Sequence, residues 1–216
     1  MSIRILLADD HAIVRHGLSR AFQQESEFEI IAQANNGLST MSLVRDLQPD
    51  IVVMDISMPD LNGIEATRQI VRDYPKVKVI GLSMHSSNKY IQEMFRAGAS
   101  GYLLKNAPFK ELVEAIKIVA EGKTYISPLV SEVVVRGYTA PEKMDNTAYA
   151  VLSVREREVL QQLSEGKTTK QIGLKLHISP KTVEVHRLNI MKKLQIDNIA
   201  QLTKYAIQEG LTEDEP

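Results

Sequence analysis

The sequence predicts a chain of two domains, in which a parallel α/β domain is followed by a small all-α domain of four helices. Three observations lead to this prediction. Five apolar runs in the first half alternate with segments of helical periodicity, a polar stretch follows them, and the remainder of the chain shows helical periodicity alone. A chain of 216 residues is long enough for two domains that each bury a hydrophobic core.

The five apolar runs are interpreted as strands buried on both faces, because four of them are rich in Ile, Val and Leu without alternating polar residues. They cover residues 3–8, 28–34, 51–54, 78–82 and 101–104. A segment of helical periodicity follows each run, and these segments cover residues 11–24, 38–47, 64–74, 88–97 and 109–121. Five strand–helix repeats predict a five-stranded parallel sheet with right-handed crossovers and helices on both faces.

The boundaries between the parts are predicted from turn and capping residues. Gly122 is suited to ending the fifth helix. Ser127 and Pro128 fit the N-cap and first position of one short helix over residues 127–135, and residues 137–147 are polar with little periodicity. The predicted division is residues 1–122 for the first domain, 123–150 for a linker that contains the short helix, and 151–216 for the second domain.

The second domain is predicted to contain four helices. Ser153 and Glu156 have the spacing of a capping box at the start of the first helix. A turn around residues 177–180 separates the second helix from the third, with Ser179 suited to the N-cap and Pro180 to the first helical position. The expected helices cover residues 153–166, 168–176, 181–194 and 198–209.

Composition excludes several classes of protein and site. The chain has no cysteine, which excludes disulfides and cysteine-ligated zinc and fits a reducing cytoplasm. No apolar run approaches the roughly 20 residues of a membrane span, and the first four residues lack the layout of a signal peptide. We therefore expect a cytoplasmic protein with no membrane partner.

The net charge of −1 conceals an asymmetry between the two domains. Residues 151–205 include ten basic and five acidic side chains, so this segment carries a charge of +5 and the rest of the chain is net acidic. The asymmetry favours a polyanionic partner for the second domain, although an ordinary solvated charged face has the same composition.

Reactive side chains follow four of the five predicted strands. Asp9 and Asp10 follow the first strand, Asp55 the third, Ser83 the fourth and Lys105 the fifth. Functional residues of a parallel α/β sheet gather beyond the carboxyl ends of the strands, so we expect these five side chains to meet. Each of them alone is ordinary at a turn or a solvated strand end, and it is their joint placement that predicts a site.

The residue types in this predicted site suit phosphoryl transfer. Three crowded carboxylates favour a hard divalent cation such as Mg²⁺. The ion neutralises phosphoryl oxygens, so that one carboxylate can attack phosphorus and become an aspartyl-phosphate. Lys105 would supply a positive charge for the phosphoryl oxygens, and Ser83 would supply a hydroxyl donor.

Three segments of the first domain resemble receiver domains of two-component response regulators. They are residues 5–10 (ILLADD), 50–63 (DIVVMDISMPDLNG) and 97–105 (AGASGYLLK), and the resemblance extends over about residues 2–121. It implies the flavodoxin-like strand order 2-1-3-4-5. It also implies a role for each matching residue: Asp55 as phosphoacceptor, Asp9, Asp10, Asp55 and the Ser57 backbone carbonyl as Mg²⁺ ligands, Ser83 and Lys105 as contacts of the phosphoryl group, and Tyr102 as the aromatic residue that turns inward.

One feature departs from many receivers. They carry a proline directly after the lysine, whereas Asn106 and Ala107 here precede Pro108. A cis Lys–Pro bond is therefore excluded at this position.

The order of helix, short helix, tight turn and helix predicts a helix-turn-helix, whose third helix enters the major groove of DNA. An ordinary amphipathic bundle has the same layout, but the positive charge of this domain favours DNA. The side chains expected on the DNA-facing side of the third helix are Lys181, Thr182, Glu184, Val185, Arg187, Leu188, Asn189, Lys192 and Lys193.

Segments of the second domain resemble the LuxR-type helix-turn-helix, and the whole chain resembles the NarL/FixJ subgroup of response regulators. The segments are residues 152–160 (LSVREREVL), 166–172 (GKTTKQI) and 178–194 (ISPKTVEVHRLNIMKKL), within a match over about residues 151–210. The resemblance implies base-edge contacts from Glu184, Val185 and Leu188, and phosphate contacts from Lys170, Thr182, His186, Arg187 and Lys192.

Two positions depart from the pattern of this group. Glu184 stands where many relatives carry lysine, which weakens phosphate attraction but allows acceptance from a cytosine amino group. Gly173 replaces a usual alanine in the second helix, at an expected cost of about 1 kcal/mol. By the same resemblance, residues 199–207 form a homodimer contact, and an inverted-repeat DNA site is expected.

The sequence as a whole predicts a phosphorylation-dependent DNA-binding transcriptional regulator. A sensor histidine kinase would supply the phosphoryl group to Asp55, which would switch dimerisation and binding to double-stranded promoter DNA. RNA polymerase is a further candidate partner. We expect no enzyme activity beyond Mg²⁺-dependent self-phosphorylation and autodephosphorylation.

Three alternatives remain beside this prediction. A phosphatase or phosphotransferase with an aspartate nucleophile often carries Asp-x-Asp, whereas residue 57 here is Ser. A nucleotide-binding α/β protein is disfavoured because the chain has neither a G-x-G-x-x-G nor a Walker A motif. A receiver fold that has lost phosphorylation is disfavoured because all five pocket residues are present.

Overall fold

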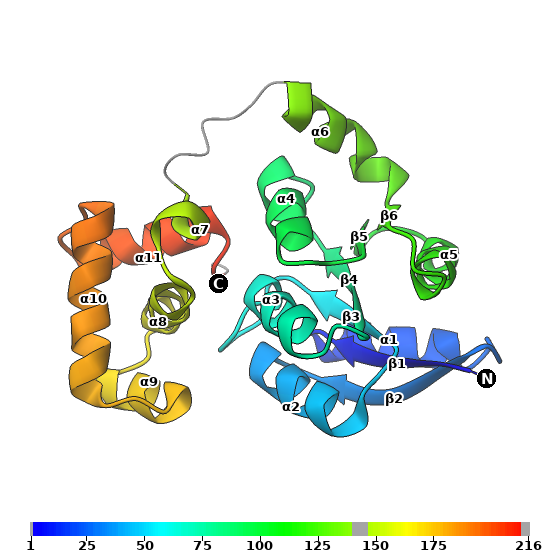
Figure 1. Cartoon of the computed structure of the whole chain (residues 1–216), viewed down its shortest axis with the longest axis horizontal. Coiled ribbons are helices and arrows are strands. Elements are labelled where there is room, and N and C mark those ends of the chain that lie inside the picture. Colours follow the sequence, from blue (N-terminus) through cyan, green and yellow to red (C-terminus); the bar gives the residue numbers. More distant parts are fainter. Residues whose placement is uncertain (1, 140–146, 213–216) are drawn as a thin grey trace. The chain divides into compact units, whose positions relative to one another are not determined.

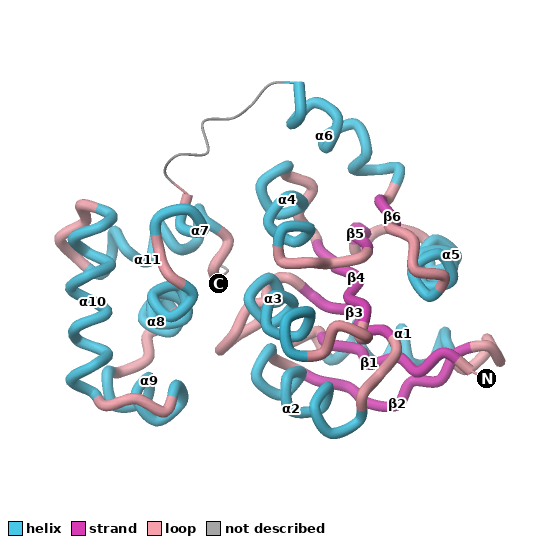
Figure 2. The backbone as a smooth tube through the Cα atoms, in the orientation of Figure 1, coloured by secondary structure: helices cyan, strands magenta, loops and turns pink. Residues whose placement is uncertain are grey.

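The chain forms two compact units, residues 1–141 and 142–216 (Figure 1). The computed structural model describes residues 2–139 and 147–212. The strands lie in the first unit and helices alone make up the described part of the second (Figure 2). In the described residues, no helix is both long enough and apolar enough to span a bilayer.

The first unit is built on a parallel sheet in the order β2-β1-β3-β4-β5-β6. The predicted order 2-1-3-4-5 is confirmed for the first five strands, but the predicted number of five strands is wrong because a sixth is added at the β5 edge. The strands are β1 Ile3–Ala8, β2 Phe28–Ala34, β3 Ile51–Asp55, β4 Lys78–Ser83, β5 Gly101–Leu104 and β6 Tyr125–Ile126.

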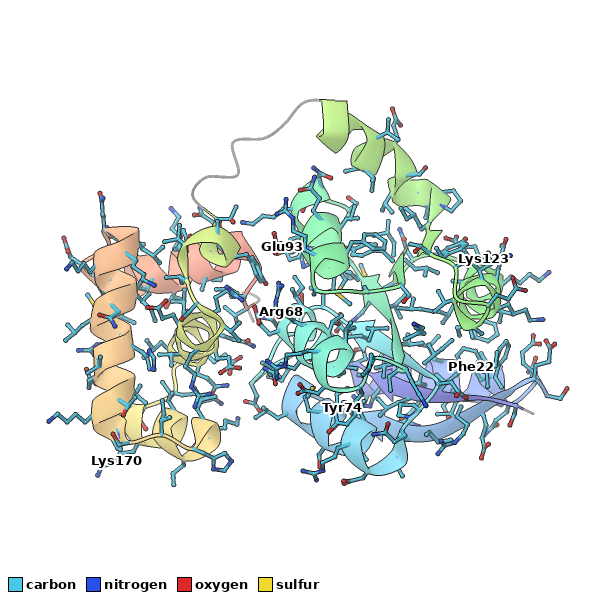
Figure 3. All side chains as sticks on the ribbon, in the orientation of Figure 1. Phe22, Arg68, Tyr74, Glu93, Lys123 and Lys170 are labelled. Atoms are coloured by element: carbon cyan, nitrogen blue, oxygen red, sulfur yellow. The ribbon has the colours of Figure 1, made fainter. Side chains whose placement is uncertain are left out.

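Helices cover both faces of this sheet, as predicted. They are α1 Ala12–Phe22, α2 Gly37–Leu47, α3 Gly63–Asp73, α4 Asn88–Arg96 and α5 Phe109–Ala120. Figure 1 shows α2, α3 and α4 on one face and α1 and α5 on the other. On the second face Phe22 packs edge-on against Phe28 and Phe109, with ring centroids 5.6 and 4.9 Å apart. A pair of charged side chains, Arg68 of α3 and Glu93 of α4, approach to 3.7 Å (labelled in Figure 3).

The β3–α3 connection, which directly follows Asp55, is held by hydrogen bonds and by a close approach of the backbone. The Gly63 N–H donates to the Ile56 carbonyl at 2.8 Å, and the Asn62 side chain caps α3 by accepting from the Glu65 N–H at 3.0 Å. A Cβ on Gly63 would lie 1.9 Å from the Asp55 carbonyl oxygen. Only glycine therefore lets the start of α3 lie this close to Asp55.

The first unit extends beyond the predicted limit at residue 122. Two residues of β6 pair with β5, with Tyr102 opposite Ile126. The buried Ser127 then donates its N–H to the Tyr102 carbonyl at 3.0 Å, and α6 (Pro128–Thr139) begins at the next residue. The helix predicted over 127–135 is therefore present and longer. Residues 140–146 of the predicted linker lie outside the described residues.

The second unit contains the four predicted helices and one short helix more. They are α7 Ala148–Val151, α8 Val154–Ser164, α9 Thr169–Leu176, α10 Pro180–Leu194 and α11 Ile199–Glu209. Ser153 and Glu156 form the predicted capping box, and Ser179 caps α10 with Pro180 in its first turn. The short α7 was not predicted, and its buried Ala148 joins the apolar core of this unit.

The turn between α9 and α10 explains Gly173. His177 adopts a left-handed conformation with φ 54°, and the Ile178 N–H donates to the Gly173 carbonyl at 2.9 Å. A Cβ on Gly173 would lie 2.8 Å from the Ile178 carbonyl oxygen. The interpretation of Gly173 as a simple helix-propensity cost is therefore incomplete, because alanine in this chain would require the backbone of the turn to shift.

Candidate functional site

Four charged side chains meet at the carboxyl edge of the sheet. Asp9 and Asp10 directly follow β1, Asp55 is the last residue of β3 and Lys105 directly follows β5, so the ends of three strands supply all four. The Lys105 Nζ lies 2.7 Å from Asp55 Oδ2 and 2.8 Å from Asp9 Oδ2. Asp9 and Asp55 are each only 3% exposed. The lysine therefore bridges two buried carboxylates at the position where the sequence predicts the reactive site.

The pKa values in this pocket follow from its burial. Burial raises the pKa of Asp55 to about 7, with Lys105 acting to lower it and Asp9 and Asp10 acting to raise it. Burial alone would lower the pKa of Lys105, but the charges and hydrogen bonds of Asp55 and Asp9 raise it overall. Lys105 thus stays protonated, and Asp55 in the pocket without a cation is poised between its two forms near neutral pH.

The acidic side chains fit a hard divalent cation. Asp9, Asp10, His11 and Asp55 each offer one ligand atom, and these atoms lie within 4.8 Å of one another. Three of the four donors are carboxylates, which are the ligands that Mg²⁺ prefers. The Ser57 N–H lies 3.4 Å from Asp55 Oδ1, while the predicted role of the Ser57 carbonyl as a metal ligand stays a prediction.

Two residues that the sequence reasoning missed, His11 and Arg15, contact the Asp9–Asp10 segment between β1 and α1. The His11 Nδ1 lies 2.8 Å from Asp10 Oδ1 and 3.3 Å from Asp9 Oδ1. The Arg15 guanidinium donates to the Asp9 and Asp10 carbonyl oxygens at 2.5 and 3.0 Å. A signal was available, because Arg15 lies one helical turn after His11 and so faces the loop that precedes α1.

Ser83 and Tyr102 lie beside the pocket and are linked through His85. Ser83 is 1% exposed, and its Oγ accepts from the His85 N–H at 3.0 Å. Tyr102 is fully buried, and its hydroxyl donates to the His85 carbonyl at 2.6 Å. The His85 ring stacks on Tyr90 with centroids 4.2 Å apart, and its Nε2 lies 3.4 Å from Ser57 Oγ. Tyr102 therefore occupies an inward position in this structure.

The third predicted helix of the second unit, α10, has the expected two faces. Val183 and Ile190 are buried in the core. Val185 and Leu188 are 50% and 61% exposed, so two large apolar side chains of this helix are open to solvent. The exposed basic residues are Lys181, Lys192 and Lys193 on α10 and, on α9, Lys170 (labelled in Figure 3), whereas Thr182, His186 and Arg187 are half-buried.

Contacts within the second unit occupy three side chains that were predicted to face DNA. The Lys193 Nζ contacts the buried Glu156 of the capping box at 2.7 Å. Glu184 contacts Thr169 of α9 and also Arg187. Lys193 is therefore tied to the core of the unit, and Glu184 and Arg187 act as a pair.

Comparison with known proteins finds a matching family for each of the two units. Residues 5–117 match the family described as response regulator receiver domain, and residues 150–206 match the family described as bacterial regulatory proteins, luxR family. The chain is 37% identical to the transcriptional regulatory protein DegU of Brevibacillus brevis, over 96% of this chain and 94% of DegU. It is 36% identical to the oxygen regulatory protein NreC of Staphylococcus carnosus, over 97% and 99%.

A solved structure of a response regulator also matches part of this chain. A two-component response regulator of the LuxR family from Aurantimonas sp. SI85-9A1 superposes with a TM-score of 0.62 and 34% identity. The match covers 65% of this chain and all of the other.

Proposed function

We infer the function of this chain from the premise that it belongs to the NarL/FixJ subgroup of two-component response regulators, which join a receiver domain to a LuxR-type helix-turn-helix. It is a phosphorylation-dependent, DNA-binding transcriptional regulator. What we propose beyond this is the role of each residue, the cation, and the form of the DNA complex.

The acidic pocket is the proposed phosphorylation site, with Asp55 as the acceptor. A carboxylate oxygen of Asp55 attacks the phosphorus of a phosphohistidine on the sensor kinase. The P–N bond breaks with its electron pair going to the imidazole nitrogen, and the new P–O bond makes an aspartyl-phosphate. Mg²⁺, when held by Asp9, Asp10, Asp55 and the Ser57 carbonyl, would neutralise charge on the phosphoryl oxygens.

The observation that carries this proposal is the contact of Lys105 Nζ with Asp55 at 2.7 Å and with Asp9 at 2.8 Å. A lysine in this position keeps the buried Asp55 close to its reactive ionised form. After transfer it exchanges the Asp55 oxygen for a phosphoryl oxygen, and the Ser83 hydroxyl donates to another. Because Ser83 and Tyr102 both bond to His85, a shift of Ser83 changes the β4–α4 loop.

The proposed output is binding of α10 in the major groove of an inverted-repeat site by a homodimer. The exposed Lys181 and Lys192, with Lys170 on α9, suit contacts to phosphates, and the exposed Val185 and Leu188 suit contacts to base edges. A chain that acts on chromosomal DNA works in the cytoplasm, which is the location that we propose. RNA polymerase is a further proposed partner, and autodephosphorylation is the only hydrolysis that we propose.

The test is footprinting of the full chain on genomic DNA with and without beryllofluoride, which mimics the phosphoryl group on an aspartate. We expect protected sites that require beryllofluoride in the unaltered chain and in Asp73→Asn, which alters an exposed carboxylate outside the pocket. In Asp55→Asn, adding beryllofluoride should no longer produce these protected sites. An undiminished response of Asp55→Asn to beryllofluoride would refute the assignment of Asp55.

A further inference from the structure

Glu184 of α10 has both of its carboxylate oxygens engaged by protein groups. The Thr169 hydroxyl of α9 donates to Glu184 Oε1 at 2.8 Å. The Arg187 Nη2, one turn further along α10, lies 3.0 Å from Glu184 Oε2. We call these three side chains the Thr169–Glu184–Arg187 triad. It joins the two helices of the helix-turn-helix on the side that faces DNA in the proposed function.

The triad differs from an ordinary surface ion pair. A pair at spacing i,i+3 on an exposed helix contributes only a few tenths of a kcal/mol, because both side chains keep their freedom. Here the two side chains are 33% and 40% exposed, and a hydroxyl from a second helix fixes the carboxylate. Glu184 is the only ion-pair partner of Arg187 within the described residues. The guanidinium is therefore held at Nη2, its Nε is buried without a hydrogen-bond partner, and Nη1 is left to donate to another ligand.

The position of the triad decides which ligand these donors meet. Glu184 is the fifth of the fifteen residues of α10 and Arg187 is the eighth, and the N-terminal residues of a recognition helix contact base edges. A guanidinium offers paired donors that match guanine, whereas a flexible arginine loses rotamer entropy when it binds. A carboxylate that already holds the guanidinium in the free protein reduces the rotamer entropy that the arginine loses when it binds DNA.

We propose that Thr169 and Glu184 are positioning residues for Arg187, and that Arg187 is a specificity-determining contact of this protein with DNA. This rests on the proposed function of α10. It changes the expected role of two residues. Glu184 acts on DNA through Arg187 instead of accepting from a cytosine, and Arg187 contributes to sequence selection as well as to attraction of phosphates.

Charge and positioning give separate readouts. The Glu184–Arg187 pair is neutral, so Glu184→Ala leaves an unopposed arginine and Arg187→Ala an unopposed glutamate. The slope of log affinity against log salt should steepen by about one unit in Glu184→Ala and flatten in Arg187→Ala. Thr169→Val removes only the hydroxyl and leaves every charge in place. Its effect on DNA binding therefore reports positioning alone.

The experiment uses the full chain with beryllofluoride, and duplexes that this chain selects from a random-sequence pool. Affinity is measured for the selected duplex and for a scrambled duplex of equal length, and their ratio is the specificity. We expect Thr169→Val to lower this ratio about three- to ten-fold, the effect of one hydrogen bond, with an unchanged salt slope. In an Arg187→Ala background the same change should alter the ratio less than about two-fold.

Ser164→Ala is the matched control, because the Ser164 hydroxyl donates only within α8, to the Leu160 carbonyl at 2.9 Å. It should leave the ratio unchanged, and circular dichroism should show every variant folded. A Thr169→Val ratio equal to that of the unaltered chain, or an equal loss with and without Arg187, would overturn the triad alone. Failure of the unaltered chain to prefer any duplex would overturn the proposed function together with it.

Discussion

Replacing Asp55 by asparagine should stabilise the first unit when no divalent cation is present. Asp55 is 3% exposed, and burial raises its pKa from 3.8 to about 7. At pH 8 the carboxylate is ionised in a pocket that disfavours its charge and already holds Asp9 and Asp10. Asparagine has nearly the same shape without the charge, so the substitution removes this strain.

The size of the effect follows from the shift in pKa. The difference between 3.8 and about 7 is roughly three units, and each unit corresponds to about 1.4 kcal/mol, which sets an upper limit of about 4 kcal/mol. Asparagine loses the contact with Lys105 at 2.7 Å, although Lys105 keeps Asp9 at 2.8 Å. We therefore expect a net gain of roughly 1–3 kcal/mol in the free energy of unfolding at pH 8.

The pH dependence has a definite sign. Between about pH 4 and 7 the folded protein retains a proton on Asp55 that the unfolded chain has released. The stabilisation from this proton is complete below about pH 4 and is lost as the pH rises through about 7. The unaltered protein should therefore lose stability over this range relative to Asp55→Asn, and the two should converge at low pH.

The assay is urea unfolding of the full chain in EDTA, followed by far-ultraviolet circular dichroism at several pH values. Only the transition of the first unit should move. Asp46→Asn is the control, because Asp46 is exposed and its pKa is lowered by Arg45, and it should bring no gain. Equal stability of Asp55→Asn and the unaltered chain at pH 8 would show that the burial of this charge is not destabilising.

Three further predictions concern other parts of the chain. Gly173→Ala places a Cβ 2.8 Å from the Ile178 carbonyl oxygen, so thermal unfolding should show the second unit less stable by roughly 1–3 kcal/mol, despite the better helix propensity of alanine. Lys193→Met leaves the buried Glu156 without its 2.7 Å partner. Burial alone would raise the pKa of Glu156, but Lys193 helps to hold this pKa below its usual value. The variant should therefore be less stable to unfolding than the unaltered chain at pH 7, and the difference should vanish on acidification. Arg15→Ala releases the Asp9 and Asp10 carbonyls and should weaken Mg²⁺ binding by roughly ten-fold in calorimetry; an unchanged affinity would limit Arg15 to a structural role.

The acidic pocket was predictable because a parallel sheet brings the ends of its strands together. Asp9, Asp55 and Lys105 are far apart in the sequence, yet each follows a run of buried residues, and the structure brings them within hydrogen-bonding distance. The starts of two helices were predictable from local sequence, because Ser153 and Ser179 are capping residues followed by helical periodicity.

Features that depend on contacts between distant residues gave little signal in the sequence. The two residues of β6 are too few to show a pattern, and their pairing with β5 is visible only in the fold. The role of Gly173 depends on the Ile178 carbonyl, and that of Glu184 on a threonine in another helix. Periodicity identifies which face of a helix is exposed, but not which exposed side chains are already bonded to each other.

The hydrogen bond between Ser127 and Tyr102 has a consequence for how a signal leaves the receiver. Tyr102, which we propose responds to Ser83, and Ser127, which precedes α6, share this bond at 3.0 Å. A displacement of the Tyr102 peptide must either break the bond or move the start of α6 with it. The last part of a path from the pocket to the exit of the domain would therefore run from Tyr102 on β5 through β6 to α6, without passing through α5.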